Sequence, residues 1–93
     1  MRTIERANTF KKDFKRESKG KYRNQLGQIL PVILNYLVND LPLEPKLRDH
    51  DLIGNWQGYR ECHLKPDLLL VYRKEGDDVL KLARLGSHSE IFG

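Results

Sequence analysis

The chain has 93 residues, which is enough for one hydrophobic core and too few for two, so we expect a single domain over residues 1–93. Its 17 basic and 13 acidic residues give a net charge of +4, and its 39% hydrophobic content is enough for the chain to fold. The single cysteine, Cys62, excludes an intrachain disulfide. No apolar run reaches the roughly 18 residues of a membrane span, so we expect a soluble cytoplasmic protein without a signal peptide.

The N-terminal segment is predicted to form a strand followed by a helix. Residues 2–6 suit a short strand. Residues 10–18 suit a helix that begins at a cap on Asn8 or Thr9. Gly20 can adopt the left-handed conformation that ends such a helix.

The strongest periodicity in the chain predicts a second helix. Apolar residues recur three and four positions apart from Leu26 to Val38, as on the buried face of an amphipathic helix. Pro31 lies within this pattern and is expected to kink the helix or to break it. The helix is expected to end near Asp40, and residues 41–57 are expected to form a loop.

The second half of the chain is predicted to form three strands and a tail. The strands are residues 58–65, 68–73 and 79–85, and the tail is residues 86–93. The short connections between these strands require antiparallel pairing. In the first of them, alternation places Arg60, Cys62 and Leu64 on one side and Tyr59, Glu61 and His63 on the other. The order β-α-α-β-β-β predicts an α+β fold, with two N-terminal helices on one face of a twisted antiparallel sheet and the other face open.

Basic residues gather near the N-terminus. Residues 1–24 hold nine of the 17 lysines and arginines and three of the 13 acidic residues. A basic face of this kind attracts nucleic acid, although it is also typical of a solvated helix surface. The candidate RNA-binding residues of the first helix are Lys11, Lys12, Lys15 and Arg16.

Three histidines lie in three separate segments of the second half. His50 is in the loop, His63 ends a strand, and His88 is in the tail. Asp67 follows His63 across a short turn, so its carboxylate could orient that imidazole, and Arg84 ends the last strand. Each of these residues could instead be an ordinary surface group. A zinc site from His50, Cys62, His63 and Asp67 fits no known ligand spacing.

The chemistry that this set could perform is cleavage of an RNA phosphodiester by its own 2′-hydroxyl. This reaction needs a base for the hydroxyl, an acid for the leaving 5′-oxygen and positive charge for the phosphorane. Histidine can serve both proton-transfer roles near neutral pH, and arginine binds phosphate oxygens through its planar fork. No metal or other cofactor is required. The residues alone leave an enzyme and a binding module about equally favoured.

Three motifs resemble a known family. They are D-H-x-L-x-G-x-W-x-G-Y-R at residues 49–60, H-x-x-P-D at residues 63–67, and G-x-H-x-x-x-F-G at residues 86–93. The chain resembles the YafQ-like toxins of the RelE/ParE superfamily, the toxins of bacterial type II toxin–antitoxin systems. The resemblance implies catalytic roles for His50, His63, Asp67 and His88, a phosphate contact for Arg84 and a pocket position for Phe92. One departure is Asp51, where the family leads us to expect proline.

The resemblance also implies a function and partners. The expected activity is that of an mRNA interferase, an endoribonuclease that cuts mRNA in the ribosomal A site. On that hypothesis His50 is the general base and His88 the general acid. The expected partners are the ribosome, mRNA and a cognate antitoxin, which would supply contacts to operator DNA. The alternatives are a ParE-like DNA gyrase inhibitor and a non-catalytic RNA-binding or antitoxin-binding module.

Overall fold

The structure is a computed structural model that describes residues 1–93. In chain order, its elements are β1 (Thr3–Arg6), α1 (Asn8–Glu17), α2 (Leu26–Val38), β2 (His50–Asp51), β3 (Arg60–Lys65), β4 (Leu68–Glu75), β5 (Val79–Gly86) and α3 (His88–Phe92). Two 3₁₀ turns, η1 (Pro45–Leu47) and η2 (Gly54–Trp56), lie between α2 and β3. The expected α+β architecture is confirmed.

The strands form one mixed sheet with the order β1-β5-β4-β3-β2. β3, β4 and β5 pair antiparallel, as their short connections require, and β2 pairs antiparallel with β3. β1 instead runs parallel to β5, so the expectation of a wholly antiparallel sheet was wrong at this edge. β1 and β5 are far apart in sequence, and the long connection between them allows the parallel return that a tight turn forbids.

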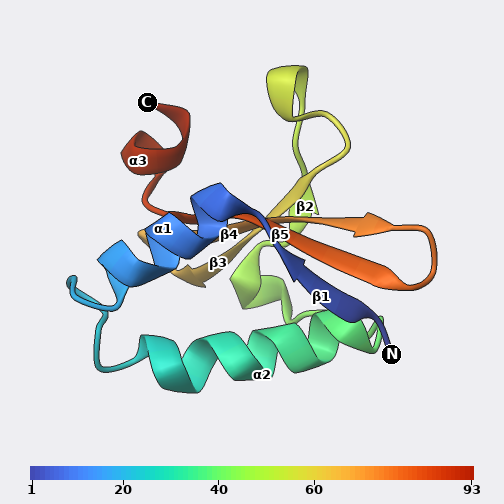
Figure 1. Ribbon diagram of the computed structural model, residues 1–93, viewed down its shortest axis with the longest axis horizontal. Coiled ribbons are helices and arrows are strands. Elements are labelled where there is room, and N and C mark those ends of the chain that lie inside the picture. The colour runs from blue at the N-terminus through green and yellow to red at the C-terminus, as the bar shows by residue number, and fades with distance from the viewer.

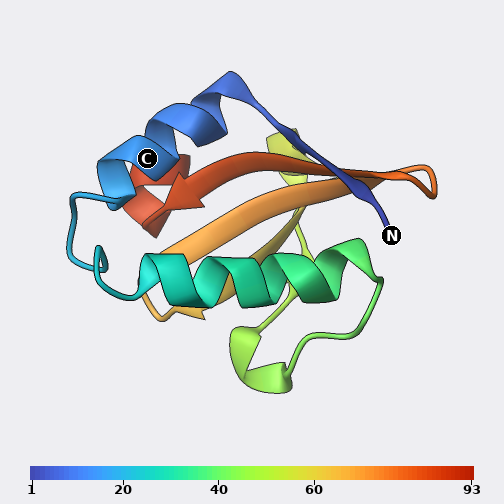
Figure 2. The ribbon, with the colours of Figure 1, turned by 60° about the horizontal axis from the view of Figure 1, so that its bottom comes forward.

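The main core lies between the two long helices and one face of the sheet (Figures 1 and 2). Phe10 of α1 and five apolar residues of α2 face buried leucines of β4 and β5. The five are Leu26, Leu30, Ile33, Leu37 and Val38. They follow the predicted spacing of three and four residues, because such positions share one side of a helix.

Two local expectations for α1 need correction, and for α2 the alternative of a break at Pro31 is excluded. α1 begins after Ala7 without a side-chain cap, because the Thr9 hydroxyl donates 2.9 Å to the Ala83 carbonyl of β5 instead. α1 ends at Glu17, and Gly20 has no positive φ. α2 is continuous through Pro31, so the helix is not broken there.

The opposite face of the sheet is partly covered, so the expectation of an open face was wrong in part. Figure 1 shows α2 on one side of the sheet and α3 on the other. Leu69, Val71 and Ala83 of the sheet pack with Ile91 of α3. The predicted tail folds into α3 because the Ser87 side chain and Glu90 form a reciprocal capping box.

The helices of the structure are too short or too polar to cross a lipid bilayer.

Candidate active site

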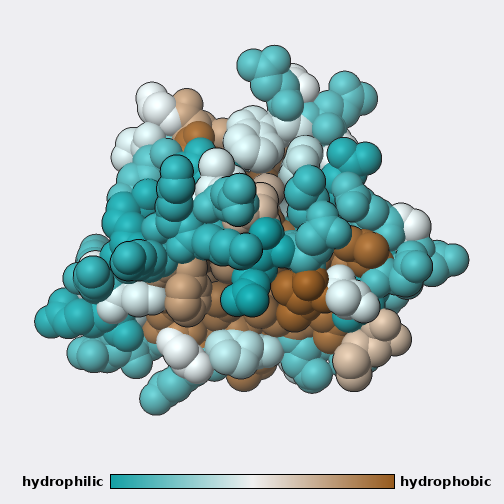
Figure 3. Space-filling model, viewed as in Figure 1, coloured by the Kyte–Doolittle hydropathy of each residue, from teal (hydrophilic) through white to brown (hydrophobic).

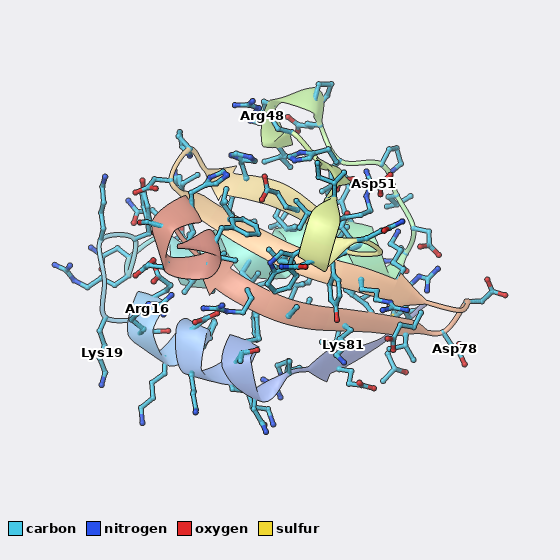
Figure 4. The ribbon with its side chains drawn as sticks, turned by 90° about the horizontal axis from the view of Figure 1, so that it is seen from above. Arg16, Lys19, Arg48, Asp51, Asp78 and Lys81 are labelled. Atoms are coloured by element: carbon cyan, nitrogen blue, oxygen red, sulfur yellow. The ribbon has the colours of Figure 1, made fainter.

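Three histidine rings line up on the sheet face that carries α3. β2 places His50 opposite Glu61 of β3, and His63 lies two residues further along the same side of β3. The ring centroids of His50 and His63 are 6.4 Å apart, and those of His63 and His88 are 6.3 Å apart. Residues from β2, β3 and α3 therefore meet within reach of one bound group. Figure 4 looks onto this face.

Glu61 is a member of this cluster that the sequence prediction missed. Its side chain is 4% exposed, and its Oε2 lies 3.2 Å from Nε2 of His50 and 3.4 Å from Nε2 of His63. The other oxygen, Oε1, is buried without a hydrogen-bond partner. The alternation of β3 already placed Glu61 on the His63 side, and a carboxylate two residues before a candidate histidine was the available signal.

The backbone around His50 also contributes to the site. Nδ1 of His50 lies 2.7 Å from the Arg48 carbonyl oxygen. Arg48 adopts the left-handed backbone conformation, with a φ of 52°. This conformation is uncommon for residues other than glycine, asparagine, aspartate and histidine. Both nitrogens of His50 therefore face acceptor atoms, although half of the side chain is exposed.

One guanidinium, that of Arg60, holds both neighbours of His50. Its Nη2 lies 3.2 Å from Oδ2 of Asp49, and its Nη1 lies 2.5 Å from Oδ1 of Asp51. The Tyr72 hydroxyl donates a 2.5 Å hydrogen bond to Oδ1 of Asp49. The hydrogen bond to Asp49 is the main cause that raises the pKa of Arg60, and burial is the main cause that raises the pKa of Tyr72. Asp51, the departure from the family pattern, thus adds a second ion pair to the β2 segment, which Figure 4 labels at Arg48 and Asp51.

Arg84 is placed between α1 and α3. Its Nε donates 2.6 Å to Asp13, and its Nη2 donates 3.4 Å to the Glu90 carbonyl. Burial opposes ionisation of Asp13, but hydrogen bonds from Arg84 and from the Leu85 amide, with the charges of Arg84 and Arg16, lower its pKa overall. A charged guanidinium is therefore fixed at the end of β5, with its Nη1 not engaged by any protein group.

Aromatic rings form one wall of the cluster. The Phe92 ring lies 5.5 Å from His88 and 5.9 Å from Trp56, in an edge-on arrangement with Trp56. Trp56 in turn meets Tyr59 edge-on at 5.3 Å. Phe92 is 39% exposed, so part of its ring is available to a bound base.

The structure does not bring Asp67 onto His63. Asp67 is exposed in the turn between β3 and β4 and makes no hydrogen bond or ion pair within the protein, while His63 contacts Glu61. The remaining histidine, His88, is exposed, and neither of its ring nitrogens is engaged by a protein group.

Nothing in the geometry supports a zinc site. No three histidine, cysteine, aspartate or glutamate side chains are arranged to hold a metal ion. Cys62 packs in the core on the helix side of the sheet, so it faces away from His63. Burial raises the pKa of the Cys62 thiol to about 12.

The basic residues of α1 differ in their availability. Lys11, Lys12 and Lys15 are exposed and form no ion pair. Arg16, labelled beside α3 in Figure 4, pairs with Asp13, Glu17 and Glu90 and donates to the Leu85 carbonyl. The three lysines are therefore free for an outside partner, whereas Arg16 joins α1 to β5 and α3.

Comparison with known proteins matches these features to one family. The family model described as a bacterial toxin of type II toxin–antitoxin systems, YafQ, matches residues 2–93. The mRNA interferase toxin YafQ of Escherichia coli K12 is 38% identical over 94 residues, covering 100% of this chain and 98% of that protein.

Solved structures of YafQ toxins have the same fold as this chain. The crystal structure of YafQ from E. coli BL21(DE3) has a TM-score of 0.85 and 35% identity, with full coverage of both chains. A chain of the E. coli DinJ–YafQ complex has a TM-score of 0.84 and 37% identity, again with full coverage. The chain therefore belongs to the YafQ family of toxins of bacterial type II toxin–antitoxin systems.

Proposed function

We propose that this protein is an mRNA interferase, an endoribonuclease that cuts mRNA in the ribosomal A site and so inhibits translation. The observation that carries this proposal is the row of three histidines on one sheet face, together with an arginine, Arg84, fixed against α3, the helix that carries His88. The E. coli relative bears the name mRNA interferase toxin, which supports the same activity here.

The cleavage needs only protein side chains. His50, His63 and His88 move protons between the 2′-hydroxyl, the leaving 5′-oxygen and solvent. Arg84 stabilises the extra negative charge of the phosphorane, because its guanidinium stays charged and is already oriented by Asp13. Phe92 stacks on the nucleotide base, and Asp67 contacts the RNA from the turn between β3 and β4.

The ribosome is the proposed platform for the reaction. Lys11, Lys12 and Lys15 of α1 are exposed and unpaired. Lysines of this kind bind the RNA backbone without reading its sequence. Ribosomal RNA contacts on α1 would hold the toxin while its histidine face meets the message.

The proposed protein partner is a cognate antitoxin, as in the DinJ–YafQ complex of the E. coli relative. A groove of about 520 Å³ runs between α1, β1 and α2, and its lining includes Ile4, Phe14, Leu34, Arg6 and Lys11. Figure 3 shows this apolar surface in brown between hydrophilic rims. Its chemistry suits an antitoxin segment with apolar and acidic residues. Operator DNA would be contacted only through the antitoxin.

The test of the activity is cleavage of a translated message in a reconstituted translation system. Breaks that need ribosomes, persist in EDTA-treated protein and disappear with His88→Ala are expected. The matched control, Ser89→Ala, alters the next exposed residue of α3 and should cleave normally. Uncut message together with inhibited DNA supercoiling would identify a gyrase inhibitor instead. Uncut message with retained RNA binding would identify a binding module.

A further inference from the structure

The hydrogen-bond surroundings of His50 determine which nitrogens carry protons. Its Nδ1 lies 2.7 Å from the Arg48 carbonyl oxygen. A carbonyl oxygen can only accept, so Nδ1 must donate. Its Nε2 lies 3.2 Å from Oε2 of Glu61. If Glu61 is ionised, Nε2 must donate as well, and the ring is then a charged imidazolium.

Burial explains why Glu61 needs that charged partner. Its side chain is 4% exposed and lies on the sheet face that Val71 and Ile91 make apolar. An ionised carboxylate in such surroundings requires a countercharge. Arg60 is on the opposite side of β3 and is engaged by Asp49 and Asp51, which leaves the imidazoles as the only cations within reach.

The second contact of Glu61 supports the ionised form. Oε2 also lies 3.4 Å from Nε2 of His63, so two ring nitrogens converge on one oxygen. A carboxylate oxygen accepts two N–H groups, whereas a protonated carboxyl has one proton to give and is a poorer acceptor. With Glu61 and His50 forming a neutral pair, His63 needs only one proton, on Nε2.

We propose that Glu61 is a positioning residue that holds His50 as a doubly protonated imidazolium and His63 as its Nε2-protonated neutral form. This inference rests on the proposed RNA cleavage for its functional meaning. It reverses the proton roles expected for His50 and His88. His50 becomes the general acid, and the exposed His88, whose nitrogens no protein group engages, becomes the base for the 2′-hydroxyl.

The proton balance of the step is complete. His88 takes the proton of the 2′-hydroxyl, the 2′-oxygen forms a bond to phosphorus, and the bond from phosphorus to the 5′-oxygen breaks. The leaving 5′-oxygen takes the Nε2 proton of His50, which must first give up its hydrogen bond to Oε2 of Glu61. His50 is then neutral, and Glu61 lacks its charged partner. The cycle closes when the proton on His88 passes through solvent and His50 is protonated again.

The test is a long-range ¹H–¹⁵N NMR spectrum of the histidine rings in the free, ¹⁵N-labelled protein near neutral pH. Ring signals are assigned with His50→Asn, His63→Asn and His88→Asn. Protons on both nitrogens of His50 and on Nε2 alone of His63 are expected. Glu61→Gln should remove the Nε2 proton of His50, because an amide carries no charge. The control Glu44→Gln, on an exposed loop carboxylate that pairs only with Lys46, should leave the spectrum unchanged.

A bare Nε2 on His50 in the unaltered protein would overturn the proposal, since Glu61 would then carry the proton. The same conclusion follows if Glu61→Gln folds and its spectrum matches the unaltered one. If Glu61→Gln does not fold, the Nε2 proton of His50 is sought in the spectra of the unaltered protein and of Glu61→Asp, and its absence from the unaltered protein overturns the proposal. In cleavage assays, kcat of Glu61→Gln should fall by about 10²-fold, with KM retained. The spectrum needs no RNA, so failure of the nuclease proposal would show as absent cleavage by the unaltered protein, whatever its ring signals.

Discussion

Asp13 in the middle of α1 accepts a 2.6 Å hydrogen bond from Nε of Arg84 at the end of β5. The same carboxylate accepts from Arg16 and from the Leu85 amide. One buried acidic residue therefore fixes Arg84, a helix and a strand relative to one another.

The first prediction concerns that carboxylate. Asp13→Asn should lower the free energy of unfolding by about 1.5–3 kcal/mol, because it weakens the hydrogen bonds that Arg84 and the buried Leu85 amide donate to a buried carboxylate. Urea denaturation measures this change. The control Asp77→Asn alters an exposed residue in the turn between β4 and β5 and should cost little. A loss below about 1 kcal/mol, the scale of a surface ion pair, would contradict the structural role of Asp13.

The second prediction concerns pH. The pKa of Asp13 in the folded protein lies below its ordinary value of 3.8. Its stabilising contribution is therefore complete above that value and is lost as the pH falls through the lower, folded-state pKa. The difference in unfolding free energy between the unaltered protein and Asp13→Asn should be constant near neutral pH and shrink below about pH 4. A difference that grows on acidification would have the wrong sign.

The third prediction concerns Tyr72, whose hydroxyl holds Asp49 beside His50. Tyr72→Phe removes one buried hydrogen bond to a charged group and should cost about 1.5–3 kcal/mol in stability. It should also lower cleavage, because Asp49 then depends on Arg60 alone to keep the β2 segment in place. Tyr36→Phe, which removes a hydroxyl with no hydrogen bond in the protein, is the matched control. It should leave both the stability and the cleavage rate unchanged.

The fourth prediction concerns Cys62, which is fully buried and whose pKa is raised to about 12. The thiolate is the reactive form, so the native protein should react very slowly with thiol reagents at pH 8. Labelling should become fast in denaturant. Rapid labelling under native conditions would mean that β3 opens from the helix-side core.

The fifth prediction separates the two surfaces of α1. Phe14→Glu should weaken antitoxin binding, because it places negative charge in the apolar groove. Val32→Glu, on an exposed position of α2 outside that groove, is the control. Changing Lys12 and Lys15 together to glutamine, with Lys11 kept because it lines the groove, should weaken ribosome binding and reduce its salt dependence. Equal effects of Phe14→Glu and Val32→Glu on antitoxin affinity would contradict the groove assignment.

Local patterns in the sequence predict most of the secondary structure correctly. The spacing of Leu26, Leu30 and Ile33 depends only on helix geometry, and the alternation through Cys62 and His63 depends only on the pleat of a strand. Local patterns do not predict features that depend on pairing between distant segments of the chain. β2 has two residues and exists because His50 pairs with Glu61, and the direction of β1 is set by its pairing with β5.

The candidate site shows the same division. The three histidines could be identified because few other side chains transfer protons near neutral pH. Glu61 was overlooked although its place on the strand was predicted. Its importance comes from burial, and glutamate is so rarely buried that its residue type predicts an exposed side chain. The S-x-x-E capping box at Ser87 was a local signal for α3 that the prediction did not use.

The pairing of β1 with β5 has a consequence for folding. Thr3 is aligned with Val79, so the chain must close a very long loop before this ladder can form. Loop-closure entropy opposes such contacts early, and folds rich in them reach the native state more slowly than helical bundles of the same size. The antiparallel hairpins of β3, β4 and β5 are local and can form first. The newly made protein should therefore pass through an interval in which the face that carries the three histidines is partly built while its N-terminal edge is still unpaired.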